Sequence, residues 1–281
     1  IIQDRIDFLN KNISLLQKNI FVNWFFPLKP HPFYLKKYEK LNKNKISLFF
    51  LLFKNFLKIL IIFFVNIFKP ISRFKNIKDT NYEYVFISHH ISNKKIFDED
   101  SYYKDVFKTL KENKIKFLKI YLNHKIKMDK EILINEDNYY FLEKNSTIGI
   151  EIICLIETLK LFFFYIKLKE LSVTEKLIII SEVFSSDTYS NLRINFQINN
   201  LFKKINFKKL ICTFEGFNFE KIIFGQSKSK DINIKNIGIQ HASIIKNQNS
   251  IYKLQDTNFF PDFIFTSGVY YEKLFKTKII N

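Results

Sequence analysis

Three apolar segments that end in small or polar residues follow one another between residues 210 and 268, and they constrain the fold of this chain most strongly. They are LICTFEGFNFEKIIFGQS, IGIQHAS and PDFIFTSG. Alternating strands and helices of this kind build an open sheet of parallel strands, in which ligands bind outside the carboxyl ends of the strands. The pattern therefore predicts an α/β domain with a functional site at one edge of its sheet.

The same alternation begins earlier in the chain. YVFIS at 84–88 and IKFLKIYL at 115–122 are rich in β-forming residues, and residues 102–113 between them carry apolar side chains at helical spacing. A strand, a helix and a second strand in this order place both strands in parallel, with their carboxyl ends on one side. We therefore expect five strand ends to meet at one edge of a Rossmann-like parallel sheet within a domain that covers residues 77–281.

Each expected strand end carries residues that suit ligand binding. Glu215 and Gly216 precede a helix whose first amides favour negative charge, so Glu215 should be ionised and able to act as a general base. The alternative is that Glu215 only caps this helix. His241 suits proton transfer or the binding of a phosphate or hydroxyl group. The remaining candidates are Ser88, His89, His90, Asn123, His124, Gln240, Thr266, Ser267 and Gly268.

Residues 1–76 are expected to form a separate helical region, with an amphipathic helix at 1–20 and a Pro-rich link after it. Residues 46–69, ISLFFLLFKNFLKILIIFFVNIFK, are apolar over nearly the length that crosses a bilayer, about 20 residues. Their Ser, Lys and Asn side chains share one sector of a helix. Because two central lysines disfavour a span, we prefer a helix lying in the membrane plane. A core helix and a true span remain the alternatives.

Two further segments carry expectations about burial. Helix 148–171 is apolar, and its charged residues are spread around it, so it should be buried on all sides. A further helical region is expected to reach Phe202. Residues 98–100 are acidic and are expected to form a solvated loop rather than a metal site.

Composition limits the classes of function. A formal net charge of +18 raises non-specific attraction to phosphates and anionic lipid. Arg, the residue best suited to base readout, occurs only at Arg5, Arg73 and Arg193, so no specific nucleic-acid binding is expected. Cys154 and Cys212 lie in apolar runs without metal-ligand spacing, which indicates a reducing compartment and no metal. No P-loop, GxGxxG, GxSxG or HExxH motif occurs.

Seven short motifs follow one another from Tyr84 onwards: FISHH, SYYKDVFKTL, YLNH, DTYSNLRI, TFEGFNFEK, IGIQHAS and PDFIFTSG. Together they resemble a family of bacterial surface-carbohydrate biosynthesis proteins, of lipopolysaccharide or capsule, that are predicted glycosyltransferases of the two-domain GT-B architecture. The resemblance implies that residues 77–281 are the amino-terminal GT-B domain and that a nucleotide-binding domain would follow. Since the chain also lacks an initiating Met, we expect it to be a piece of a longer protein.

The resemblance extends to more distant capsule sialyltransferases and glycerophosphotransferases, and it implies roles for individual residues. Glu215 would be the general base, His241 would bind the acceptor or the donor phosphate, and Arg193 in DTYSNLRI would bind substrate. The activity implied is transfer of a sugar or sugar-phosphate from a nucleotide-activated donor to a glycan or lipid-linked glycan acceptor.

By the same resemblance, no metal or other cofactor takes part, and the protein acts in the cytoplasm, peripherally at the inner face of the plasma membrane. The piece given is expected to be inactive by itself. A non-catalytic, membrane-associated scaffold of a polysaccharide assembly complex is the alternative function, because the segment 46–69 is so apolar.

Overall fold

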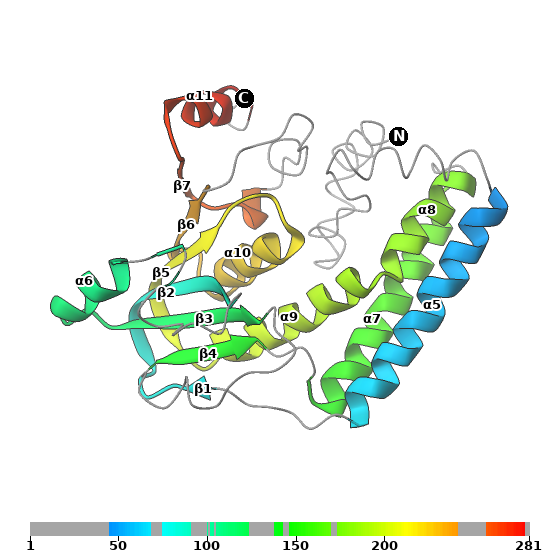
Figure 1. Cartoon of the computed structure of the whole chain (residues 1–281), viewed down its shortest axis with the longest axis horizontal. Coiled ribbons are helices and arrows are strands. Elements are labelled where there is room, and N and C mark those ends of the chain that lie inside the picture. The colour runs from blue at the N-terminus through cyan, green and yellow to red at the C-terminus, as the bar shows by residue number, and fades with distance from the viewer. Residues whose placement is uncertain are drawn as a thin grey trace.

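The computed structural model describes residues 45–68, 75–90, 100, 102–103, 105–123, 138–142, 146–169, 173–240 and 257–278. These residues form a seven-stranded sheet and a group of three helices beside it, which a fourth helix joins to the sheet (Figure 1). The expected helix at 1–20 and the Pro-rich link lie outside the described residues.

Six parallel strands make up the body of the sheet, and the predicted α/β class is confirmed. A two-residue strand, β1 (Lys75–Asn76), pairs antiparallel with β4 at one edge. Two strands, β1 and β4, have no counterpart among the expected elements. The parallel strands are β2 (Asn81–His90), β3 (Phe117–Asn123), β4 (Tyr139–Leu142), β5 (Asn206–Thr213), β6 (Lys235–Ile239) and β7 (Phe263–Phe265).

The strand order is β1-β4-β3-β2-β5-β6-β7. From β2 the chain adds β3 and β4 on one side, and then returns to the other side of β2 with β5, β6 and β7. The junction of β2 and β5 is therefore the topological switch point, where the loops that follow the two strands leave towards opposite faces of the sheet. A crevice at the carboxyl ends of these two strands is the usual place for a ligand in such sheets.

Helices cover both faces of the sheet. Along β2, Val85 and Ile87 face one side and Phe86 the other, as the period of two in a strand requires. Phe86 packs against Phe107 of α6 (Val106–Glu112). The opposite face packs against α9 (Ser186–Phe202) and α10 (Asn218–Lys230), and α11 (Val269–Lys278) follows β7.

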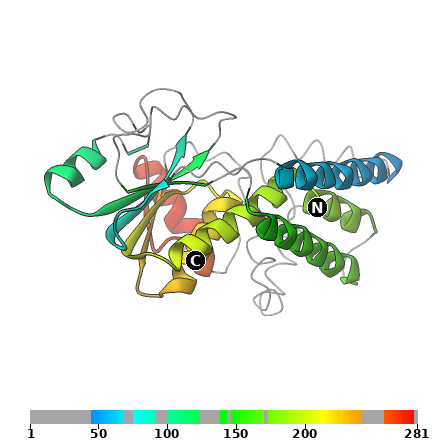
Figure 2. The same cartoon turned by 90° about the horizontal axis from the view of Figure 1, so that it is seen from below.

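The helical group consists of α5 (Lys45–Phe68), α7 (Ile148–Lys167) and α8 (Val173–Val183), which lie together beside the sheet (Figure 2). The three helices share a hydrophobic core that includes Leu48, Ile59, Leu161 and Ile179. α9 begins in this core with Tyr189 and Leu192 and ends in the core of the sheet with Ile198, Leu201 and Phe202. It therefore fixes the helical group to the sheet.

Two expectations about burial are wrong. α7 is buried on one face only, because its other face turns Ile152, Ile156 and Phe163 outward. α5 is not a core helix, since only 11% of its apolar stretch is buried inside the protein. Within the described part of the chain, α5 is a helix long and apolar enough to cross a membrane, from Ile46 to Phe68.

A buried carboxylate lies where the start of α7 meets α9 and the end of α5. Glu151 of α7 forms a two-pronged ion pair with Arg193 of α9, at 2.7 Å to Nε and 3.1 Å to Nη2. The hydroxyl of Tyr189, the backbone N–H of Ser146 and the amide of Asn66 on α5 also donate to it, at 3.0, 3.0 and 3.4 Å. The Glu151 side chain is 0% exposed and that of Arg193 is 5% exposed. The ion pair of Glu151 and Arg193 thus holds α5, α7 and α9 together, and its carboxylate is fully hydrogen-bonded.

Replacing Arg193 with Met should lower the free energy of unfolding by about 3–5 kcal/mol, because it leaves the charge of Glu151 buried without its partner. Lys208→Met is the control, since Lys208 pairs with Glu83 at 2.8 Å with most of its side chain exposed. That variant should lose less than about 1 kcal/mol. Denaturant unfolding of both variants measures the difference, and equal losses would contradict a central role for the buried pair.

Candidate active site

Four aromatic rings form a row across the switch point between β2 and β5. Phe217 stacks on Phe219 of α10 at 5.7 Å between ring centroids, and Phe219 meets His89 of β2 edge to face at 5.5 Å. His89 in turn lies 5.1 Å from Tyr102, which precedes α6. We call Phe217, Phe219, His89 and Tyr102 the aromatic row. It joins the loop after β5 to the end of β2, as expected of a crevice at the carboxyl edge.

Glu215 lies beside this row. It follows β5 in the loop before α10, and its side chain is half-buried. Burial and then the negative charge of Glu215 raise the pKa of the Tyr102 hydroxyl, which places the two side chains near one another. The predicted base and the predicted ligand-binding residue His89 are therefore brought to the same end of neighbouring strands.

A buried aspartate holds Tyr102 in place. Asp100 accepts a hydrogen bond from the Ser88 hydroxyl at 2.6 Å and from the backbone N–H groups of Tyr102 and Tyr103 at 2.9 and 3.0 Å. The expectation that Asp100 is solvated is wrong, because these three donors replace water around its carboxylate. Ser88, predicted to bind substrate, is itself buried and donates to Asp100, so it orients the turn that carries Tyr102.

A second carboxylate organises the loop that carries Glu215. Glu220, in the first turn of α10, accepts the backbone N–H groups of Glu215, Gly216 and Phe217 at 2.9, 2.8 and 2.9 Å. Its other oxygen accepts the hydroxyl of Thr213 at 3.0 Å. Gly216 has φ of 86°, a backbone conformation that favours glycine and lets consecutive amides turn towards one oxygen. The loop is therefore held by a carboxylate of its own chain.

This arrangement corrects two expectations about the start of α10. The amides that bind an acid before α10 are those of residues 215–217, which precede the helix, and the acid is Glu220 rather than Glu215. The alternative role of Glu215 as the helix cap is wrong, because α10 begins at Asn218 and the N-cap is Phe217, whose N–H is bound by Glu220. Glu215 thus precedes the cap, and its side chain is not used to begin the helix.

Burial gives the carboxyl group of Glu220 an unusually high pKa. Removal from water raises its pKa to about 8, although the hydrogen bonds from Glu215, Thr213 and Phe217 act to lower it. The neighbouring Lys221 is also buried, and burial lowers the pKa of its amine to about 8. Glu220 therefore changes charge near neutral pH, directly beneath the loop that carries Glu215.

The remaining predicted site residues are placed as follows. Gln240 is buried after β6, and its side-chain oxygen accepts the N–H and the hydroxyl of Ser267 at 3.2 and 3.1 Å, so these two residues tie the ends of β6 and β7 together. Gly268 is exposed beside them. Arg193 lies inside the helical group, bound to Glu151 and away from this edge, and we do not include it in the site. His124, His241 and the side chains of His90 and Asn123 lie outside the described residues.

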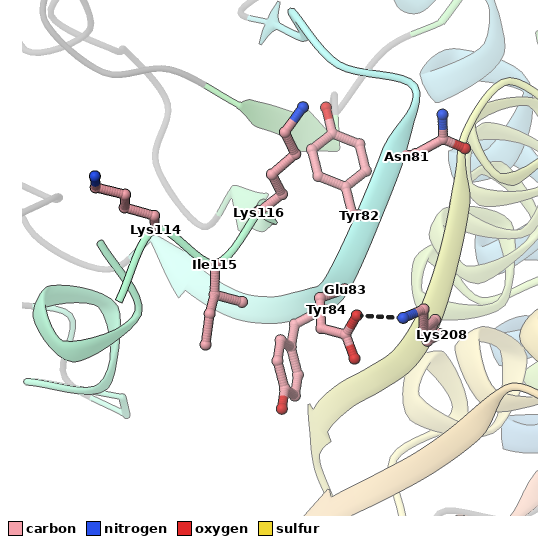
Figure 3. Close-up of a pocket in the computed structure, with 8 residues that line it drawn as sticks. All are labelled: Asn81, Tyr82, Glu83, Tyr84, Lys114, Ile115, Lys116 and Lys208. Carbon is pink, nitrogen blue, oxygen red and sulfur yellow. Dashed lines mark ion pairs between the residues drawn. The ribbon is translucent and has the colours of Figure 1, made fainter. Parts of the chain in front are cut away.

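A cavity of about 490 Å³ lies at the opposite, amino edge of the sheet (Figure 3). β2 begins at Asn81 and β3 at Phe117, so the cavity is a full strand length away from Glu215. Two of its lysines already have acidic partners: Lys208 pairs with Glu83 at 2.8 Å and Lys116 with Asp79 at 2.9 Å. We place the candidate site at the carboxyl edge, where the fold brings loops together. The cavity is lined by Asn81, Tyr82, Glu83, Tyr84, Lys114, Ile115, Lys116 and Lys208.

The sequence analysis assigned no role to Glu220 or to the aromatic residues Phe217, Phe219 and Tyr102. Glu220 stands three residues after the N-cap, the position of a glutamate in a capping box, and this spacing is a signal that could have identified it. Phe219 and Tyr102 gave no such signal, because their importance comes from the rings that the fold places beside them. In the part of the chain that the structure describes, no three His, Cys, Asp or Glu side chains are grouped to hold a metal ion.

Glu220→Gln should make stability less dependent on pH. The pKa of Glu220 is raised from 4.5 to about 8, so its stabilising effect is complete below about pH 4.5 and is lost as pH rises through 8. At about 1.4 kcal/mol for each pKa unit, the loss amounts to a few kcal/mol. Gln can accept the same three N–H groups and donate to Thr213, and it carries no charge.

Denaturant unfolding of the wild type and of Glu220→Gln from pH 5 to pH 8 measures this effect. Lys221 hardly changes the pH dependence of stability below pH 8. Its pKa is lowered from 10.5 to about 8, so its protonation differs between the folded and the unfolded state only between about pH 8 and pH 10.5. The stability difference between wild type and variant should change steadily with pH. A constant difference would show that Glu220 does not titrate in this range.

Comparison of the chain with known proteins gives no match: no family model, no curated protein and no solved structure matches it. The geometry at the switch point and the motifs from Tyr84 onwards are therefore the features that indicate a function.

Proposed function

We propose that this chain is the acceptor-activating part of a GT-B glycosyltransferase of surface polysaccharide biosynthesis, of lipopolysaccharide or capsule. The observation that carries the proposal is the aromatic row beside Glu215 at the topological switch point. Ligand pockets combine aromatic walls with a few polar groups that orient the ligand. A sugar ring has apolar C–H faces and polar edges, and it suits a row of aromatic rings that ends beside one carboxylate.

The proposed reaction begins with an acceptor hydroxyl bound beside Glu215. Its carboxylate takes the proton as the acceptor oxygen forms a bond to the anomeric carbon of the donor sugar, or to phosphorus if a sugar-phosphate is transferred. The bond to the nucleotide phosphate breaks, and the electron pair leaves with that phosphate. Glu215 then returns its proton to water. In this proposal no metal takes part, and the nucleotide-activated sugar is a substrate rather than a cofactor.

The loop geometry supports the role of Glu215. A general base must be held in place and must keep water access, so that it exchanges its proton between turnovers. Glu215 is half-buried, and its backbone N–H is bound by the buried carboxylate of Glu220 at 2.9 Å. His241, which would bind the acceptor or the donor phosphate, follows Gln240 at the end of β6, and β6 is the strand next to β5. Its role remains part of the proposal.

The proposal places the protein in the cytoplasm, at the inner face of the plasma membrane, where nucleotide-activated sugars meet lipid-linked glycans. One observation favours the alternative, a non-catalytic membrane-associated scaffold. The amides of residues 215–217, which a phosphate group of a donor would use at a helix amino terminus, are occupied by Glu220. The scaffold would retain the fold and the membrane contact without turnover.

Glu215→Gln should lower turnover at least about 100-fold, the scale of the loss of a general base. The assay uses the full-length protein with UDP-, GDP- and CMP-linked sugars and lipid-linked glycans from bacterial membranes, and it measures nucleotide release. The matched control is Glu112→Gln, which removes an exposed carboxylate at the end of α6 and should leave turnover unchanged.

Two results would oppose the proposal. Turnover of Glu215→Gln equal to that of the wild type would remove Glu215 as the base. No nucleotide release from any of the donors, together with intact folding and vesicle binding, would favour the scaffold.

A further inference from the structure

The polar side of α5 faces the protein. Asn55 donates to the backbone oxygen of Ser181 on α8 at 2.8 Å, and Asn66 donates to Glu151 on α7 at 3.4 Å. Lys58 donates to the hydroxyl of Ser186, at the start of α9, at 3.2 Å. A helix at a water-exposed surface turns its polar side outward, so the orientation of α5 is the reverse of that arrangement.

The opposite side of α5 is apolar and exposed. At about 100° per residue its outward side chains fall in one sector of the helix. α7 has an equivalent outward face, and the two helices contact each other in the helical group (Figure 2). The residues are Ile46, Phe49, Phe50, Phe53, Leu57, Ile61, Phe64, Val65 and Phe68 of α5, and Ile148, Ile152, Ile153, Ile156, Phe163 and Ile166 of α7. We call them the outer apolar face.

Most of the exposed large hydrophobic side chains are gathered in the outer apolar face. Fifteen of the twenty-three large hydrophobic side chains that are exposed in the described residues belong to it, and each of the fifteen is at least 40% exposed. Concentrated apolar surface of this kind marks a contact with a membrane or with another protein.

The charges beside the face distinguish these two occupants. α5 contains no acidic residue, and both acidic residues of α7, Glu151 and Glu157, are buried. Among the described side chains of the two helices, the exposed charged ones are Lys54, Lys58, Lys160 and Lys167, and Lys160 pairs with Glu157 at 2.6 Å. A second copy of the same face would bring lysine against lysine, whereas anionic lipid supplies the opposite charge.

We propose that the outer apolar face lies in the surface of an anionic bilayer, with its side chains among the acyl chains. Lys54 borders this face on α5, so its amine reaches the lipid phosphates while its stem follows the apolar surface. Asn55 and Asn66 point away from the lipid, into the helical group. The polar sector of 46–69 is therefore divided, because its asparagines bind the neighbouring helices.

The lysines and the length of α5 indicate that this helix lies in the plane of the membrane. α5 has 24 residues, or about 36 Å of helix, so it could cross a bilayer of about 30 Å by length alone. A span would place Lys54 and Lys58 within the acyl layer, whereas a helix in the plane keeps Lys54 at the level of the phosphates and leaves Lys58 with Ser186. The inference deepens the membrane location within the proposed function, and it does not depend on the chemistry proposed for Glu215.

Dye-labelled single cysteines in the full chain test the contact with lipid. Cys154 and Cys212 are fully buried, so added surface cysteines can be labelled selectively. Phe50→Cys and Phe64→Cys probe two points of α5 about 21 Å apart along its axis, and Ile156→Cys probes α7. Ile232→Cys, exposed between α10 and β6, is the matched control. Vesicles of phosphatidylcholine and phosphatidylglycerol carry brominated acyl chains that quench a nearby dye.

The dyes at 50, 64 and 156 should be quenched, and those at 50 and 64 by bromines at the same shallow depth. The dye at 232 should be unaffected. A signal from Leu57→Cys about 10 Å deeper than the signals from positions 50 and 64 would overturn the in-plane orientation, because a span places the middle of α5 at the centre of the bilayer. Unquenched dyes on α5, or a stable dimer that buries these positions and is not displaced by vesicles, would overturn the proposal as a whole.

A second experiment compares vesicles with and without anionic lipid. Lys54→Gln and Lys167→Gln should each weaken binding to vesicles with phosphatidylglycerol by about fivefold, and they should have no effect on vesicles of phosphatidylcholine alone. Lys203→Gln and Lys235→Gln remove exposed lysines near the sheet and serve as controls. Equal effects of all four variants would contradict a defined lipid-facing surface. Glu215→Gln should bind vesicles like the wild type, so failure of this inference is distinguishable from failure of the proposed chemistry.

Discussion

The buried pair of Glu151 and Arg193 is the interaction on which the arrangement of this protein depends. Its carboxylate holds α7 to α9 through Arg193 and Tyr189, and it holds α5 through Asn66. Because α9 continues into the core of the sheet, the pair also sets where the helical group lies relative to the strands. The same contact turns the polar side of α5 inward and so leaves its apolar side outward. One charge pair therefore links the outer apolar face to the α/β domain.

Two other buried carboxylates shape the carboxyl edge of the sheet. Asp100 fixes the turn that carries Tyr102, and Glu220 fixes the loop that carries Glu215. Each acid is satisfied by backbone amides and a hydroxyl, which offsets the cost of burying it. The consequence is a rigid frame on both sides of the switch point, with the aromatic row between them. This preorganisation is the physical basis for proposing transfer chemistry at Glu215 rather than at the amino-edge cavity.

The sequence predicted the elements whose signals are local. β2, β3, β5, β6 and β7 are apolar runs bounded by polar residues, and the predicted α/β class followed from their alternation with helices. The four-residue β4, YYFL, is too short for a clear alternating pattern, and only its pairing with β3 makes it a strand. Burial of Asp100, Glu151 and Glu220 was not predictable, because an acid is buried only when donors distant in the sequence satisfy it. The outward face of α7 escaped prediction for the same reason: an apolar helix is expected to be buried, but its sequence does not say which side the rest of the protein covers.

Hydrogen exchange with nucleotide-activated sugars tests most directly whether the carboxyl edge is the ligand site. With UDP-, GDP- or CMP-linked sugar added to the full-length protein, exchange should slow in peptides covering 85–90 and 213–221. Exchange in peptides covering 81–84 and 114–116, which line the amino-edge cavity, should not change. Slower exchange confined to the cavity peptides would contradict the account, because it would place the ligand at the wrong end of the strands.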